Sequence, residues 1–247
     1  MSDQPMSSLY GDRPQPPKPI APSLLDQILG VFTSPVELFQ RLNKAPSWGP
    51  ALGVVLGTAL VLTVIWGLKV DVDELLRPAL ERNPQVASSQ IDLIVGFYKK
   101  FLLPLSVFST LFFTALFTFL TALLYWLVGR SMAEGEPPTY RHALSAVAVP
   151  SLVRLPSMLL TAMICLAGSI GGLTPEKIPP TSLGYFVQVE SVKVHALLYS
   201  LDLFFFAEAA LLFLAARHTL RLRTGGAVGC LLITLTLGIG LRVLGAK

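Results

Sequence analysis

Charged residues are scarce in this sequence. Lys and Arg number 19 and Asp and Glu number 15 among 247 residues, so only 14% of the chain is charged, whereas an average soluble domain has about 25%. Charged residues are nearly absent from several long apolar blocks, and 53% of all residues are hydrophobic. A soluble helix would show a polar face at every turn. The deficit therefore indicates an integral membrane protein.

Residue types that build metal and catalytic sites are also few. Cys165 and Cys230 both fall inside apolar blocks, where they suit neither a disulfide framework nor a metal site. His142, His195 and His218 lie on separate segments without metal-ligand spacing. The sequence has no Gly-x-Ser-x-Gly, Walker-type or His-Glu-x-x-His motif, and no basic groove with interleaved aromatics. We therefore expect no enzymatic activity, no cofactor, no metal and no nucleic-acid partner.

Five apolar blocks are long enough to span a membrane. A helix needs about 20 predominantly apolar residues to cross the hydrocarbon core. The blocks that meet this requirement cover residues 48–68, 101–128, 151–173, 194–216 and 225–244. Pro150 and Pro156 break the start of the third block, so that the chain is expected to cross only from about Ser151. We predict an all-α integral membrane protein with five transmembrane helices.

The residues before the first span differ in composition from the rest. Five prolines lie between positions 14 and 22, and this density opposes a stable helix or strand. We predict a disordered Pro-rich tail over residues 1–22 and a membrane domain over residues 23–247.

Two short helices are predicted between the tail and the first span. Ser23 can cap a helix over residues 24–32. Ser34, followed by Pro35 and Glu37, fits the capping box of a helix over residues 35–44. This second helix has one apolar and one polar side, so we expect an interfacial amphipathic helix in the headgroup plane.

The orientation is nearly balanced by charge. With an internal N-terminus, nine Lys and Arg residues fall on each side of the membrane. The densest cluster near span ends is Arg217, Arg221 and Arg223, and such clusters favour the cytosol. With five spans, this places the N-terminus in the cytosol and the C-terminus across the membrane.

Three short motifs are arranged around these blocks in an order typical of one family. They are Ser34–Phe39 with Ala45–Trp48 at the first span, Tyr140–Leu144 before the third, and Leu201–Phe204 in the fourth. In this arrangement the chain resembles the Yip family of five-span membrane proteins, which interact with Rab/Ypt-type GTPases, and in particular its bacterial members. The resemblance implies a Yip-like membrane domain, membrane organisation or trafficking in eukaryotes, no settled activity in bacteria, and a location in the bacterial cytoplasmic membrane.

Three charged residues lie deep inside the apolar blocks: Arg154, Asp202 and Glu208. Such groups are costly and face the bundle interior or water, so they form either structural ion pairs or a transport path. Asp202 and Glu208 are six residues apart, about 240° around a helix, which argues against a paired-carboxylate site. Glu208 lies about 13 Å along the helix from Arg217, and Arg154 enters from the same side. We therefore predict that Arg154 pairs with Glu208 rather than with Asp202.

Small residues recur at helical spacing in two blocks: Gly49, Gly53 and Gly57 in the first, and Gly225 and Gly229 in the fifth. This spacing lets helices approach closely. We predict helix packing at these positions, against either this chain or a second copy.

Hydroxyl side chains form a further stripe in the second block, at Ser106, Thr110, Thr114, Thr118 and Thr121. Such a stripe lines a hydrated pathway, or its hydroxyls bond their own helix or a neighbour. The second arrangement is the commoner one.

Two functions fit these features. The first is a non-enzymatic multi-pass membrane protein that organises membrane, lipids or partner proteins, with the lipid bilayer, a second copy or other membrane proteins as partners. The alternative is a small-solute or ion transporter or channel that uses Arg154, Asp202 and Glu208.

Overall fold

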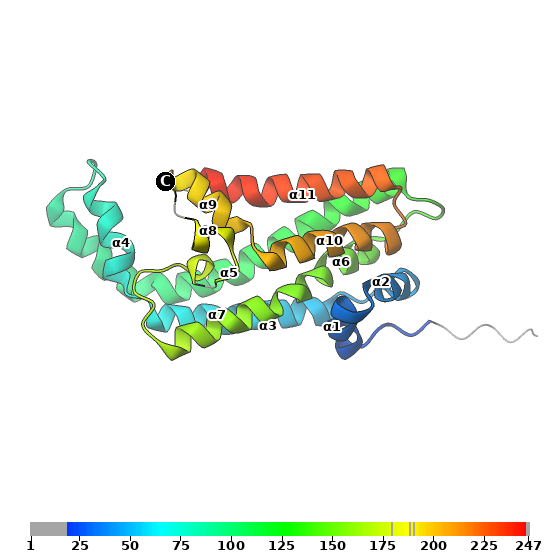
Figure 1. Ribbon diagram of the computed structural model, residues 1–247, viewed down its shortest axis with the longest axis horizontal. Helices are drawn as coiled ribbons and strands as arrows, with labels where there is room; N and C mark the ends of the chain where they lie inside the picture. Colours follow the sequence, from blue (N-terminus) through cyan, green and yellow to red (C-terminus); the bar gives the residue numbers. More distant parts are fainter. Residues whose placement is uncertain (1–18, 179, 188, 190, 246–247) are drawn as a thin grey trace, which may run out of the picture.

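A computed structural model describes residues 19–178, 180–187, 189 and 191–245. Within these residues the chain is helical, and its only β-pairing consists of two isolated bridges. The long helices run side by side along the long axis of the molecule (Figure 1). Most of the predicted tail, residues 1–18, lies outside the described residues.

The helices follow the apolar blocks closely at the start of the chain and less closely near its end. Their order is α1 (Leu24–Thr33), α2 (Pro35–Lys44), α3 (Gly49–Lys69), α4 (Val72–Glu81), α5 (Ser88–Met132), α6 (Tyr140–Ala148), the 3₁₀ helix η2 (Pro150–Arg154), α7 (Leu155–Ala167), η3 (Pro175–Lys177), α8 (Leu183–Phe186), α9 (Val192–Ser200), α10 (Leu203–His218) and α11 (Thr224–Gly245).

Three helical segments are long and apolar enough to cross a membrane: Gly49–Lys69, Ser88–Met132 and Tyr140–Ala167. They contain the first two predicted spans and most of the third. The 45 residues of α5 extend about 68 Å, roughly twice the thickness of the hydrocarbon core. The first part of α5 therefore continues beyond the membrane-spanning region.

The predicted fourth span is not one continuous helix. The chain leaves α9 at Ser200 and begins α10 at Leu203, with Asp202 as the N-cap. Leu201 and Leu203 instead pair with an earlier segment: Leu183 N donates to Leu201 O at 3.0 Å, and Leu203 N donates to Thr181 O at 3.3 Å. The expectation of a single helix over residues 194–216 is wrong because backbone pairing satisfies the polar groups at the break. The fifth block coincides with α11.

The amphipathic helix α2 buries its apolar side in the protein. Leu38, Phe39 and Leu42 are at most 3% exposed and pack in the main core, where α2 contacts α10 and α6. The expectation that this side faces the headgroup plane is therefore wrong. The neighbouring α1 carries the exposed apolar stripe instead, since Leu25 and Phe32 are more than half exposed.

The two predicted helix caps, at Ser23 and Ser34, have different outcomes. Ser23 and Asp26 form the box at α1: Asp26 N donates to Ser23 Oγ at 3.2 Å, and Ser23 N donates to Asp26 Oδ2 at 3.0 Å. Ser34 makes no side-chain cap at α2. Its own N–H closes α1 by donating to Gly30 O at 3.0 Å, so this residue ends one helix as it begins the next, and its backbone does not adopt the extended cap geometry.

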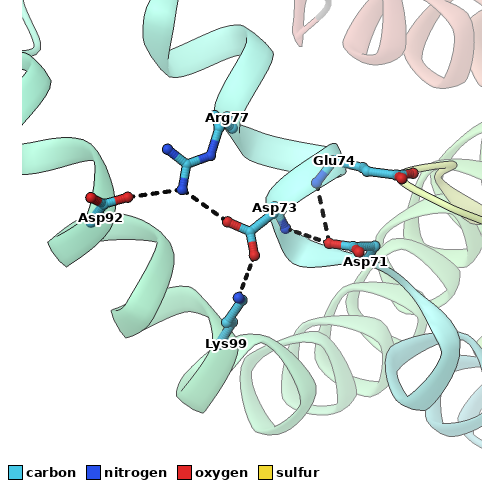
Figure 2. A network of polar contacts seen from close by, with 6 residues as sticks. All are labelled: Asp71, Asp73, Glu74, Arg77, Asp92 and Lys99. Carbon is cyan, nitrogen blue, oxygen red and sulfur yellow. Dashed lines mark hydrogen bonds and ion pairs between the residues drawn. The ribbon is translucent and has the colours of Figure 1, made fainter.

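Helix α4 and the first part of α5 form a charged hairpin at the end of the molecule opposite α1 (Figures 1 and 2). Arg77 Nη2 contacts Asp73 at 3.1 Å and Asp92 at 2.8 Å, and Lys99 pairs with Asp73. The hydrogen bonds from Lys99 and Arg77 lower the pKa of Asp73, and those to Asp92 and Asp73 raise the pKa of Arg77. The network connects the two helices above a small apolar core of Val72, Ile91 and Val95.

Candidate functional site

Arg154 and Glu208 form an ion pair between η2 and α10. Arg154 Nε lies 2.5 Å from Glu208 Oε2, and the two side chains are 33% and 14% exposed. Ser151 Oγ donates to the other carboxylate oxygen of Glu208 at 2.9 Å. The predicted preference of Arg154 for Glu208 over Asp202 is confirmed.

The 3₁₀ turn explains why Ser151 and Arg154 meet the same carboxylate. Pro150 opens η2 after α6 has ended, since proline cannot donate to the preceding helical turn. Side chains three residues apart eclipse one another in a 3₁₀ helix. Ser151 and Arg154 therefore point to the same side, toward Glu208. Sequence reasoning missed Ser151, although its spacing from Arg154 after Pro150 carried the signal.

The ion pair lines a small cavity of about 140 Å³. Two hydroxyl residues of α5, Thr114 and Thr118, lie on its wall, together with apolar residues of α3 and α7. Thr118 Oγ1 donates to Thr114 O in its own helix at 2.8 Å. Ligand pockets usually measure about 300–1,000 Å³, so this cavity is too small for a solute larger than a few water molecules.

The remaining members of the hydroxyl stripe are used in contacts or lie away from the cavity. Thr110 Oγ1 lies 3.1 Å from Thr63 Oγ1 of α3. Ser106 and Thr121 are not among the residues lining the cavity. The stripe thus contributes both to helix packing and to the cavity wall.

Asp202 does not join the Arg154–Glu208 pair. Its carboxylate accepts the backbone N–H of Phe205 at 2.6 Å and so caps α10. The residue also forms an isolated antiparallel bridge with Ser182. The three charges of the apolar blocks are therefore divided between one ion pair and one helix cap.

The predicted glycine stripes make no close contacts within the described part of the chain. A Cβ placed at any of these glycines would meet no atom within 4 Å; they are Gly49, Gly53, Gly57, Gly225 and Gly229. The prediction that these glycines pack against other helices of the same chain is therefore wrong. The alternative, that they pack against a second copy, stays a prediction. Close approach occurs at Gly67 instead, where a Cβ would lie 2.7 Å from Leu103 Cδ1.

Residues of the second motif join α2 to α6. His142 Nδ1 accepts the N–H of Thr139 at 3.1 Å, so the proton lies on Nε2, which is 3.0 Å from Asn43 O. Asn43 Nδ2 in turn donates to Thr219 O at 2.7 Å, and Thr219 Oγ1 donates to Phe39 O at 3.1 Å. These bonds fix α2 across the end of the bundle.

One comparison with known proteins identifies a family. The family model of the Yip1 domain matches residues 29–245. Neither a curated protein nor a solved structure matches the chain significantly.

Proposed function

The chain belongs to the Yip1 domain family, and from this premise we propose that it is a non-enzymatic five-pass protein of the bacterial cytoplasmic membrane that organises lipids and membrane partners. Its three membrane-length apolar helices make it a membrane protein. The two further passes, α10 and α11, the cytosolic N-terminus and the organising role are what we propose beyond these three helices.

Contacts at one end of the bundle support five passes. Glu134 N donates to Arg221 O at 2.8 Å, and Ala133 pairs with Leu222, so the loop after α5 lies against the turn between α10 and α11. Segment α6–α7 starts at this end and leads away from it (Figure 1). In the proposed five-pass arrangement, the chain returns through α10 and leaves again through α11. The 16 residues of α10 span about 24 Å, and a helix of this length is accommodated by local thinning of the bilayer or by snorkelling of its flanking residues.

The observation that carries the organising role is the use made of the deep charges. Arg154 and Glu208 neutralise one another beside a cavity of about 140 Å³, and Asp202 caps a helix. A transport path would need ionisable groups in series along a hydrated route. The pair instead holds η2 against α10, which favours a scaffold.

The open glycine faces supply contact surfaces for such a scaffold. Gly49, Gly53 and Gly57 lie on one side of α3 with no neighbour, where another helix could approach closely. A Gly53→Cys variant, oxidised in native membranes, should give a cross-linked dimer of twice the monomer mass. Leu120→Cys, which lies exposed on α5, is the matched control. Equal or absent cross-linking at Gly53 would remove this face from the proposal.

Transport remains the alternative because Ser151, Thr114 and Thr118 give the ion-pair cavity hydroxyl-bearing walls. Liposomes containing the purified protein should show proton, potassium and chloride fluxes equal to those of protein-free liposomes. A flux that disappears in a folded Arg154→Met/Glu208→Gln double variant would establish the transporter instead.

A further inference from the structure

A basic pocket lies between the end of α2, the end of α10 and the loops beside them. Figure 1 shows where these elements meet, at the end of the bundle that carries α1 and α2. The pocket has a volume of about 390 Å³, within the usual range of ligand sites. Four segments far apart in the sequence form its walls: the end of α2, the loop after α5, the end of α10 and the turn before α11. The lining residues are Gln40, Asn43, Lys44, Glu134, Arg217, His218 and Arg221.

Positive charge exceeds negative charge in this pocket. Lys44, Arg217 and Arg221 face a single carboxylate, that of Glu134. Glu134 has its ion-pair contact with Arg223, at 3.9 Å. Within the described ranges, no carboxylate lies within ion-pair distance of the three pocket cations. Such an arrangement of like charges favours an anionic occupant.

The backbone holds the two arginines in place. Arg217 Nη1 donates to Leu222 O at 2.5 Å, which fixes the guanidinium without neutralising it. Arg221 has a φ of 55°, a conformation that is costly for a residue with a side chain and that clusters at ligand sites. The hydrogen bond from Glu134 N to Arg221 O maintains this conformation. Arg221 is thus both the residue with the strained backbone and one of the three cations that line the pocket.

The position of the pocket selects the source of the anion. It lies where the apolar helices α10 and α11 meet, and exposed apolar residues lie on two other helices that reach this end, Leu29 on α1 and Met132 at the end of α5. Apolar groups beside a basic pocket match the boundary between acyl chains and headgroups. Basic pockets between membrane helices on the cytosolic side bind anionic headgroups.

We propose that this pocket binds the phosphate-bearing headgroup of an anionic phospholipid in the adjacent leaflet. Arg217 and Arg221 hold the phosphate, and Lys44 covers it from α2. The inference rests on the proposed five-pass placement, which sets this end at the headgroup level. It deepens the organising role by naming a class of lipid.

The test measures the thermal stability of the purified full-length protein in a neutral detergent. Phosphatidylglycerol added to the micelles should raise the melting temperature, because a ligand that binds only the folded state stabilises it. Phosphatidylcholine and inorganic phosphate at the same concentration should give no comparable rise. An equal rise with phosphatidylcholine would overturn the proposal, and one with inorganic phosphate alone would assign the pocket to the free ion.

Variants locate the effect. Arg221→Gln and Lys44→Gln should each weaken phosphatidylglycerol binding about fivefold, as expected for the removal of one positive charge near a lipid surface. Arg130→Gln is the control, since Arg130 lies over the Trp126 ring and not in the pocket. Lys44 is exposed on α2, so its variant keeps the test valid if Arg221→Gln fails to fold. An equal loss in Arg130→Gln would contradict the proposal. Binding in micelles is independent of the cross-linking test, so the two proposals can fail separately.

Discussion

Arg154 and Glu208 stabilise the fold only when both are present. Loss of one partner leaves a charge without compensation, which costs roughly 3–5 kcal/mol for a buried pair. We expect the lower end of this range because Arg154 is one-third exposed. Arg154→Met and Glu208→Gln should each reduce the folded yield in detergent, and the double variant should lose less than the sum of the singles. Additive losses would show that the contact between them contributes nothing.

His218 gives the pocket end a pH dependence. Burial and the charge of Arg217 lower the pKa of His218 from its ordinary value, and Lys44, Arg221 and Glu134 also line its pocket. The folded state thus binds its proton less readily than the unfolded state, so stability should fall as the pH drops below about 6.5.

Melting temperatures between pH 8 and pH 5 check this expectation for His218. His218→Gln should lose part of the decrease on the acid side. His195→Gln, at the opposite end of the bundle, should retain it. An unchanged acid limb in the His218 variant would assign the dependence to other groups.

Helix α10 depends on Asp202 for its start. The carboxylate accepts the Phe205 N–H at 2.6 Å, and loss of an N-cap costs about 0.5–2 kcal/mol. Asp202→Ala should lower the melting temperature, whereas Asp202→Asn should retain most of the stability because its side-chain oxygen can accept the same bond. Equal losses in both variants would show that the charge, and not the cap, stabilises this region.

The apolar blocks predict where helices form better than they predict whether a helix runs unbroken through a whole block. A block without charge has few ways to satisfy its backbone except as a helix, and α3 and α5 follow this rule. Asp202 was read as a charge inside a span. The helix breaks at Asp202, where the chain pairs with the segment around Ser182, and periodicity carries no information about such a distant partner.

The amphipathic pattern of α2 illustrates a second limit. The pattern identified which side is apolar, and that side is buried. The amphipathic pattern alone does not distinguish lipid from protein as the surface that covers this side, because burial of Leu38 and Phe39 is favourable in both environments. The Arg154–Glu208 pair was predictable because depth along two helices is set by residue count alone. The basic pocket was not predictable because four distant segments build it.

In the proposed five-pass arrangement, the two ends of the bundle face opposite sides of the membrane. One end carries α1, α2 and the turn between α10 and α11, and the other carries the α4–α5 hairpin (Figure 1). The proposed lipid site depends on this placement, which sets its end of the bundle at the headgroup level. A three-pass protein would instead leave α10 and its following turn on the same side as the α4–α5 hairpin.

Cysteine labelling in intact cells tests this placement most directly. Asn83 and Arg223 are both exposed, whereas the native Cys165 and Cys230 are buried. Asn83 lies between α4 and α5 and Arg223 between α10 and α11, and Figure 1 shows these two connections at opposite ends of the bundle. With a membrane-impermeant maleimide, Asn83→Cys should be labelled in intact cells, and Arg223→Cys should be labelled only after the membrane is opened. Labelling of both variants in intact cells would contradict five passes, and labelling of Arg223→Cys alone would invert the orientation.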